Sequence, residues 1–238
     1  MLRQTHDSVL GQSLACDHIL IADGHPQEDI AKWNAQHIVL TNSHADNGNT
    51  PRGIGTNRAR VKGYDFISYL DADNWFEPGH IQSLVNLYEQ TQAPVCTSFR
   101  NFFALDDSPL NVSELDEESL MHVDTSCYLI HSSAFHLTDL WLKMPKSLGP
   151  LCDRVFLSYI KSQKITIKST AQRTVNFRSQ YEFHYLAAKK TTPENVKTRE
   201  EFRAGLDYLK SPEGMKECRE KMNFWPLPYL LRRRGAAS

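Results

Sequence analysis

Two carboxylates separated by a single residue, Asp71 and Asp73, follow an apolar stretch over residues 66–70. Along a β-strand, residues i and i+2 point to the same side, so the two side chains are expected to lie together. Like charges held side by side repel each other, and their burial is costly unless a positive charge lies between them. The pattern therefore fits either a divalent cation site or a solvated turn that contains two acids.

Short apolar runs alternate with segments of helical spacing in the first part of the chain. Strands are predicted over residues 18–22, 37–41 and 66–70, and helices over residues 2–12, 26–33, 52–63 and 78–90. This alternation predicts an α/β fold, Rossmann-like, with a mostly parallel sheet flanked by helices on both faces. Ligands of such sheets bind beyond the carboxyl ends of the strands, so Asp23, Asp71 and Asp73 are expected to face one crevice.

The pattern changes near Thr192. Further strands are predicted over residues 94–99, 125–131 and 164–168, with a helix over residues 151–162, whereas only helices are predicted afterwards, over residues 193–209 and 212–222. We therefore predict one domain over residues 1–190 and a helical C-terminal extension over residues 191–238. The extension ends in a basic tail that contains Arg232, Arg233 and Arg234.

The composition is typical of a soluble globular protein, because 40% of the 238 residues are hydrophobic and 23% are charged. The formal net charge of −1 gives no general attraction to nucleic acid. The five cysteines are scattered and odd in number, which favours reduced thiols over a disulfide framework or a zinc site. No apolar run reaches the length of a membrane span, and the first residues lack the pattern of a secretory signal. A cytoplasmic protein is the expectation.

Three stretches occur in an order that is typical of a known family: SVLGQS (residues 8–13), HILIADG (residues 18–24) and PRGIGTNRARVKGYDFISYLDADNWFEP (residues 51–78). Together they resemble the GT-A glycosyltransferases of the family 2 type, which transfer a sugar from a nucleotide diphosphate. In that family a strand ends in Asp-Asp-Gly, and a later strand ends in a Leu-Asp-x-Asp motif that holds a divalent metal. The resemblance covers residues 1–86 well, and continues more loosely through residues 125–131 and the helix that begins with CDRVF (residues 152–156).

The sequence departs from the family pattern at two places. The chain begins at the helix that normally follows the family's first strand, which contributes to the nucleotide pocket. Either the start of the sequence has been lost or wrongly assigned, or the sheet is completed in another way. In addition, Ala22 stands where the family usually has the first Asp of Asp-Asp-Gly, which leaves Asp23. Both departures fall on the side that recognises the base, whereas the metal side is intact.

The resemblance implies a site for Mn²⁺ or Mg²⁺, cations that prefer oxygen ligands and neutralise a leaving diphosphate. It assigns Asp73 as a direct metal ligand, and Asp71 as a residue that acts through the ribose or through metal-bound water. His184 is a candidate third metal ligand, because some relatives place a histidine late in the domain. A lone histidine of this kind is also compatible with a purely structural role.

Nucleotide binding is implied for Arg52, which opens the segment that resembles the family's arginine-bearing region. Its guanidinium suits a phosphate or a uracil carbonyl. Arg58 and Arg60 are alternatives, and each of the three also fits a solvated helix face. Asp23 is a candidate hydrogen-bond acceptor for the ribose or base, or else an ordinary turn residue before Gly24.

Inverting transfer needs a base that deprotonates the acceptor hydroxyl. In the family this carboxylate opens a helix, usually in a Glu-Asp pair, and here Asp153 takes the matching position with Cys152 in place of the Glu. An Asp at a helix start is also a common cap. Asp124 and Trp75 are candidates for the acceptor side, and Trp75 fits a core position equally well.

The expected activity is that of a metal-dependent inverting glycosyltransferase, active in polysaccharide biosynthesis. Its donor would be a nucleotide-diphosphate sugar, UDP-linked rather than GDP-linked, and its acceptor a glycan or a lipid-linked saccharide. The tail WPLPYLLRRR (residues 225–234) either contacts the inner face of an anionic membrane or packs on the domain. Two rivals stay open: a nucleotidyltransferase, and a non-catalytic transferase-like binding or scaffold domain.

Overall fold

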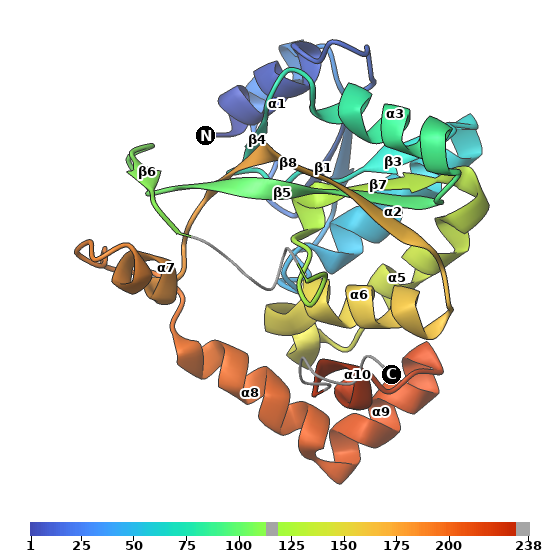
Figure 1. Cartoon of the computed structure of the whole chain (residues 1–238), viewed down its shortest axis with the longest axis vertical. Helices are drawn as coiled ribbons and strands as arrows, with labels where there is room; N and C mark the ends of the chain where they lie inside the picture. The colour runs from blue at the N-terminus through green and yellow to red at the C-terminus, as the bar shows by residue number, and fades with distance from the viewer. Residues whose placement is uncertain (113–118, 232–238) are drawn as a thin grey trace.

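The computed structural model describes residues 1–112 and 119–231, and it contains two sheets flanked by helices (Figure 1). In the smaller sheet, β1 (Ile19–Asp23) runs parallel to β2 (Gln36–Leu40). The larger sheet has the order β3-β7-β5-β8-β4, with β6 paired to β5. Its strands are β3 (Phe66–Ser68), β4 (Trp75–Phe76), β5 (Val95–Phe103), β6 (Pro109–Leu110), β7 (Tyr128–His131) and β8 (Ile167–Arg178).

The larger sheet is mixed, which differs from the mostly parallel arrangement that the alternation predicted. Only β5 and β8 run parallel in it, while the described pairs of β3 with β7, β5 with β7, β4 with β8 and β5 with β6 are antiparallel. The parallel pairing of β1 with β2 stands apart from this sheet. The carboxyl end of β3 still delivers Asp71 and Asp73 to the pocket described below.

Helices cover both sides of the larger sheet (Figure 1). On one side lie α1 (Leu2–Leu10) and α3 (His80–Thr91), and on the other lie α2 (Asn49–Lys62), α5 (Leu140–Lys143) and α6 (Cys152–Ser162). Helix α2 is bounded by Gly48, with φ of 82°, and Gly63, with φ of 75°. Both values lie in the left-handed region that glycine adopts without steric cost. Glycines thus define the helix that carries Arg52.

Shorter elements connect these layers. The 3₁₀ helices are η1 (Glu28–Lys32), η2 (Thr125–Cys127), η3 (Ser132–Asp139) and η4 (Lys146–Leu151), and the remaining α-helices are α7 (Glu182–Ala187), α8 (Arg199–Lys210), α9 (Pro212–Met222) and α10 (Leu227–Leu230). Helices α8 and α9 are capped by the preceding residues Thr198 and Ser211, whose side chains accept hydrogen bonds from backbone N–H groups of the first turn.

The described part of the predicted C-terminal extension, residues 191–231, packs on the side of the larger sheet that is covered by α5 and α6 (Figure 1). Its buried residues Leu209, Cys218 and Met222 belong to the same hydrophobic cluster as Leu151 and Phe156. Residues 191–231 therefore share one core with the preceding residues. The arginines at 232–234 lie outside the described residues. Within residues 1–112 and 119–231, no helix combines the length and the apolar character needed to cross a bilayer.

Candidate active site

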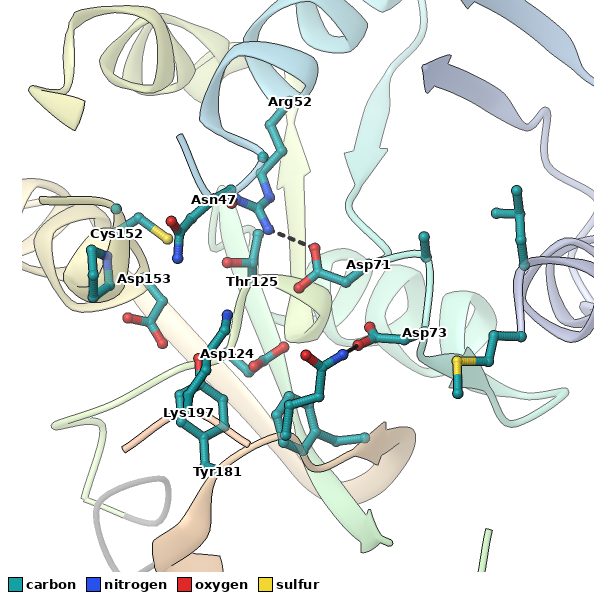
Figure 2. A pocket seen from close by; sticks show the side chains of 18 of the residues that line it. Asn47, Arg52, Asp71, Asp73, Asp124, Thr125, Cys152, Asp153, Tyr181 and Lys197 are labelled. Atoms are coloured by element: carbon teal, nitrogen blue, oxygen red, sulfur yellow. Dashed lines mark hydrogen bonds and ion pairs between the residues drawn. The ribbon is translucent and has the colours of Figure 1, made fainter. Parts of the chain in front are cut away.

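Five aspartates line one open pocket of about 880 Å³: Asp29 of η1 and the four that are labelled in Figure 2. Asp71 and Asp73 follow β3, Asp124 precedes η2, and Asp153 lies in the first turn of α6. Arg52 of α2 enters from another side. We call Arg52, Asp71 and Asp73 the Asp73 side of the pocket, and Asp124, Cys152 and Asp153 the Asp153 side.

Arg52 pairs with the first acid of the opening motif. Its Nη2 lies 2.5 Å from Asp71 Oδ1, and its Nη1 donates to the backbone oxygen of Asn47 at 2.7 Å. The guanidinium also lies over the Trp141 ring, 5.4 Å from its centroid, and only 11% of the side chain is exposed. Burial by itself would lower the pKa of Arg52, but the neighbouring Asp71 carboxylate raises it. A permanently charged cation therefore faces the pocket.

The two alternative arginines do not reach this position. Arg60 donates to Asp139 Oδ1 at 2.7 Å and to the Phe135 backbone oxygen, on the side of α2 that packs against η3. Arg58 is not among the residues that line the pocket. Of the three arginines considered, Arg52 alone is placed to meet a ligand there.

Asp73 has a different environment from Asp71. Its Oδ2 accepts a hydrogen bond of 2.6 Å from Gln180 Nε2, and among the described residues no Lys, Arg or His forms an ion pair with it. Burial, reinforced by the negative charge of Asp71, raises the pKa of Asp73 to about 6. A half-buried carboxylate without a positive partner is a suitable position for a bound cation.

The donor set suits a hard cation that is held only in part by protein. Over residues 1–112 and 119–231, no cluster of three His, Cys, Asp or Glu side chains is arranged to hold a metal ion. Mg²⁺ is commonly bound by one or two carboxylates, with waters and substrate phosphates completing its shell. Asp73, with Asp71 beside it, fits this pattern of incomplete protein coordination.

Asp124 caps η2 and pairs with a buried arginine. Its Oδ1 accepts from the Ser126 backbone N–H at 2.9 Å, and its Oδ2 lies 2.9 Å from Arg100 Nη1. Burial raises the pKa of Asp124, although Arg100 opposes this shift. The Arg100 side chain is 2% exposed and lies over the rings of Phe102 and Phe177. The pair fixes this wall of the pocket.

Asp153 is held by donors at both oxygens. The Arg154 backbone N–H donates to Oδ1 at 2.7 Å, and His122 Nε2 lies 2.5 Å from Oδ2. Burial alone would raise the pKa of Asp153, but attraction to His122 and Arg154 outweighs it and lowers the value to about 2. The carboxylate therefore stays ionised while 23% of its side chain is exposed.

Three of the predicted site residues do not line the pocket. Asp23 ends β1 and accepts from the His44 backbone N–H at 3.0 Å, while its Oδ1 lies 2.6 Å from His44 Nδ1. These contacts stabilise the turn after β2. Asp23 thus has the environment of an ordinary turn residue, the alternative to binding the ribose or base. Attraction to His44 and its hydrogen bonds lower the pKa of Asp23, although burial opposes them.

Trp75 and His184 also have partners elsewhere. Trp75 lies in β4 with its ring 4.8 Å from Phe103, between centroids, and with the Arg178 guanidinium 4.9 Å away. His184 is 1% exposed, and its Nδ1 lies 2.7 Å from Ser179 Oγ. The ring is thus directed into the protein rather than toward Asp73. Trp75 thus has the environment of a core residue and His184 that of a structural histidine, which are the alternatives to their predicted roles in the site.

The pocket also contains residues that the sequence did not indicate. Lys197, in the predicted extension, lies with its Nζ 5.4 Å from the centroid of the Tyr181 ring, and both residues line the pocket (Figure 2). The Lys197 backbone N–H donates to the Gln180 oxygen at 2.6 Å, which joins the extension to the segment after β8. Among the described residues no acidic side chain forms an ion pair with Lys197. No local motif marked it.

Comparisons with known proteins agree with this picture. The sequence model described as "Glycosyl transferase family 2" matches residues 1–128, more than half of the chain. No curated protein matches the chain significantly. Similar solved structures include S. aureus TarS 1-349 in complex with UDP-GlcNAc, with a TM-score of 0.57 and 12% identity over 93% of this chain and 68% of that one.

Two further TarS structures extend this likeness. S. aureus TarS 1-349 in complex with UDP gives a TM-score of 0.56 at 11% identity, over 93% of this chain and 67% of that one. A longer S. aureus TarS chain gives 0.56 at 12% identity, and this chain spans only 40% of its length. At such identities the likeness concerns the fold, and it confirms the α/β fold of the GT-A type.

Proposed function

Because the chain belongs to glycosyl transferase family 2, and is thereby a glycosyltransferase, we propose that its pocket transfers a sugar from a nucleotide-diphosphate donor to a hydroxyl with inversion at the anomeric carbon. The observation that carries this proposal is the convergence of Asp71 and Asp73 with Asp153 in one cavity. The first two are the proposed residues for a diphosphate and its cation. The third is the proposed base.

The proposed donor is a UDP-sugar. UDP and UDP-GlcNAc are the ligands named for the TarS structures of similar fold, which makes UDP-GlcNAc the first compound to test. Arg52 supports a nucleotide diphosphate as ligand, because its guanidinium is charged and lies at the pocket wall. Lys197 supplies a second cation on the opposite rim. Phosphate oxygens are strong acceptors for such groups.

The proposed cofactor is Mn²⁺ or Mg²⁺, held by Asp73 with help from Asp71. A divalent cation would neutralise charge on the diphosphate as it leaves the sugar. The raised pKa of Asp73 supports this assignment, because the ionised carboxylate lacks a positive partner within the described residues. His184 takes no part in the proposed site, since its ring is directed into the core.

In the proposed reaction, Asp153 accepts the proton of the acceptor hydroxyl. The acceptor oxygen forms a bond to the anomeric carbon, while the bond from that carbon to the diphosphate oxygen breaks and its electron pair leaves with UDP. Arg52 and Lys197 stabilise the negative charge on the departing diphosphate. Asp153 suits the task of base because it is ionised and partly exposed to the pocket.

The acceptor is proposed to be a growing glycan or a lipid-linked saccharide, in polysaccharide biosynthesis in the cytoplasm. The basic tail at 232–234 would attract an anionic membrane at its inner face. This part of the proposal rests on sequence, since the tail lies outside the described residues.

The decisive experiment is a calorimetric titration of UDP into the protein with Mn²⁺, repeated with EDTA and with Asp73→Ala. We expect binding that requires the metal and is lost in the variant, because Asp73 is the proposed ligand. A matched control is Asp139→Ala, an acid that binds Arg60 and does not line the pocket. Absence of binding by UDP and by GDP in all conditions would contradict the enzymatic proposal and favour the scaffold alternative.

A further inference from the structure

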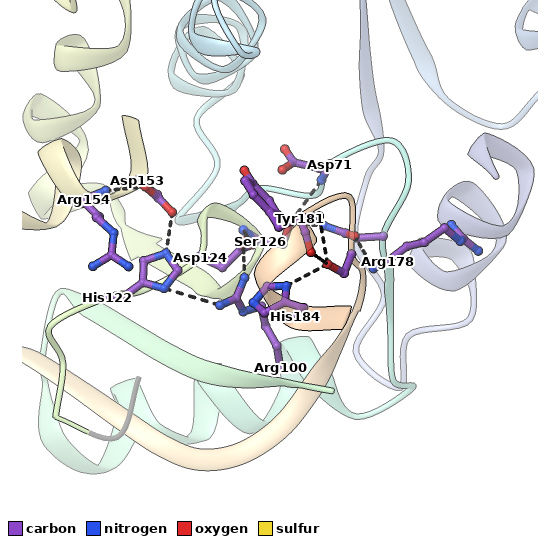
Figure 3. A network of polar contacts seen from close by, with 12 residues as sticks. Asp71, Arg100, His122, Asp124, Ser126, Asp153, Arg154, Arg178, Tyr181 and His184 are labelled. Carbon is purple, nitrogen blue, oxygen red and sulfur yellow. Dashed lines mark hydrogen bonds and ion pairs between the residues drawn. The ribbon is translucent and has the colours of Figure 1, made fainter. Parts of the chain in front are cut away.

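A tyrosine between the two sides of the pocket carries a hydroxyl without a protein partner among the described residues. Tyr181 lines the pocket, and its side chain points toward the space between Asp153 and Asp71 (Figure 3). Its backbone N–H is hydrogen-bonded, but its phenol oxygen forms no hydrogen bond within the part of the chain that the structure describes. The hydroxyl is therefore available to a ligand.

The backbone around Tyr181 is fixed by the start of the predicted extension. Lys197 forms a parallel β-bridge with Tyr181. The Lys197 N–H donates to the Gln180 oxygen at 2.6 Å, and the Lys197 oxygen accepts from the Glu182 N–H at 3.1 Å. The N–H of Tyr181 itself donates to Ser179 Oγ at 3.1 Å. Because the residues on both sides of Tyr181 are held, the fold sets the direction of its side chain.

The ring of Tyr181 is also enclosed by neighbouring side chains. It lies at 18° to the Phe177 ring, with 6.3 Å between the centroids, and its centroid is 5.5 Å from that of Phe183. Lys197 Nζ lies over the ring, 5.4 Å from its centroid. A tyrosine has only two rotatable side-chain bonds, so these contacts leave its hydroxyl little freedom. A donor that is already oriented loses little entropy when it binds a ligand.

The surroundings of this hydroxyl favour its protonated form. Burial raises the pKa of Tyr181, and the negative charges of Asp153 and Asp124 raise it further. At neutral pH the phenol is therefore an uncharged hydrogen-bond donor with carboxylates nearby. Ionised carboxylates only accept hydrogen bonds, so they cannot replace the phenol in binding an oxygen that needs a donor.

The proposed reaction brings the transferred sugar to this hydroxyl. The diphosphate is assigned to the Asp73 side of the pocket, and the acceptor hydroxyl to Asp153. In an inverting displacement the anomeric carbon lies between the attacking oxygen and the leaving oxygen, so the sugar ring fills the space between the two sides. Gln180, which precedes Tyr181, donates to Asp73 Oδ2 at 2.6 Å. Tyr181 therefore borders the space of the sugar, next to its diphosphate end.

We propose that Tyr181 recognises the transferred sugar: its hydroxyl donates a hydrogen bond to an oxygen substituent of the sugar ring, between the proposed metal ligand Asp73 and the proposed base Asp153. This inference deepens the proposed function and rests on it for the places of the diphosphate and the acceptor. It makes Tyr181 a residue of donor specificity, because a sugar without that oxygen would leave the hydroxyl unpaired. The ligand class is a nucleotide sugar whose ring carries a hydroxyl or an acetamido carbonyl at that position.

The first test compares UDP and UDP-GlcNAc in calorimetric titrations with Mn²⁺. Tyr181→Phe removes only the hydroxyl, so the Kd for UDP should stay unchanged while the Kd for UDP-GlcNAc rises by about fivefold to tenfold. No acceptor is present, so the effect belongs to the sugar of the donor. A matched control is Tyr88→Phe, which removes a hydroxyl that contacts His131 outside the pocket and should change neither Kd.

The second test identifies the oxygen that Tyr181 binds. Analogues of UDP-GlcNAc that each lack one sugar hydroxyl, and a 2-deoxy analogue without the acetamido group, are titrated into the wild type and into Tyr181→Phe. For one analogue the difference in Kd between the two proteins should disappear, because the missing oxygen and the missing phenol are the two partners of one hydrogen bond. For the other analogues the difference should persist.

Equal affinities of the wild type and Tyr181→Phe for UDP-GlcNAc and for its C4 epimer UDP-GalNAc, with UDP bound normally, would overturn the inference and leave the proposed function standing. A loss of UDP affinity in Tyr181→Phe as large as that of UDP-GlcNAc would assign the hydroxyl to the diphosphate and also overturn it. So would a difference in Kd that persists for every analogue. Absence of UDP binding by the wild type would instead contradict the proposed function, and the inference with it.

Discussion

The two sides of the pocket shift the pKa values of their carboxyl groups in opposite directions. On the Asp73 side, burial and the neighbouring Asp71 raise the pKa of Asp73 to about 6. On the Asp153 side, His122 and Arg154 lower the pKa of Asp153 to about 2 against the effect of burial. Carboxylates whose pKa values are pushed apart in one site commonly have different roles. Within the described residues the Asp153 carboxylate has a basic partner in His122, whereas the Asp73 carboxylate is bound by Gln180 and has no cationic partner of its own, which a bound metal ion would supply.

The largest expected effect comes from Asp153. In Asp153→Asn the side chain keeps its size but loses its basicity, so we expect kcat to fall by about 10³-fold. UDP binding measured by calorimetry should stay unchanged, because the Asp73 side is intact. Weakened UDP binding of similar size would show that the two sides are not separable.

Arg52 should give the next largest effect. Arg52→Lys keeps the charge but replaces the planar fork that contacts both Asp71 and the Asn47 backbone, so we expect the Kd for UDP to rise by about tenfold. Calorimetry in Mn²⁺ measures this directly. Arg60→Lys, on the same helix but outside the pocket, is the matched control and should leave the Kd unchanged.

Substitution of Lys197 should also weaken donor binding, but by less than substitution of Arg52. Lys197→Ala removes a cation from the rim, so we expect KM for the donor to rise by about fivefold, with Lys197→Arg close to wild type. Steady-state kinetics with UDP-GlcNAc measure the change. An effect confined to kcat, with KM unchanged, would contradict a role in donor binding.

The smallest effect concerns stability without ligand. Because the pKa of Asp73 is raised in the folded protein, its contribution to stability is present below about pH 4 and is lost as the pH rises through about 6. Asp73→Asn avoids this loss, so at neutral pH the metal-free variant should be more stable by about 1 kcal/mol, after allowance for partial exposure.

Thermal melts at several pH values, with and without Mn²⁺, test this expectation. The higher stability of Asp73→Asn should vanish near pH 4. It should reverse in the presence of Mn²⁺ and UDP, because these ligands stabilise only the wild type. A variant that is less stable than the wild type at neutral pH in EDTA would contradict the account of Asp73.

Local pattern predicted much of this molecule. The strand predicted over residues 18–22 is Ile19–Asp23, which a short apolar run indicates, and the helix predicted over residues 151–162 is Cys152–Ser162. Arg52, Asp71, Asp73, Asp124 and Asp153 all reach one pocket. Each lies at or near the end of an element, where the sequence pattern itself indicates a site.

The remaining features depend on partners far away in sequence. The strand predicted over residues 164–168 instead runs from Ile167 to Arg178, because it pairs along β5, about 70 residues earlier. His184 and Trp75 are turned away from the pocket by neighbours such as Ser179 and Phe103, which no local pattern reveals. The sequence pattern assigns Lys197 to a separate extension, because only folding brings it beside Gln180.

The residue that precedes α2 has no side chain, yet it lies close to the Arg52 guanidinium. Gly48 precedes α2 with φ of 82°, and a Cβ atom built there would lie 3.3 Å from the Arg52 guanidinium carbon. Any replacement would strain the backbone and press on the pocket's buried cation at once. A mutational survey restricted to polar side chains would miss this position. A single methyl group there should nevertheless displace the Arg52 guanidinium from the pocket wall.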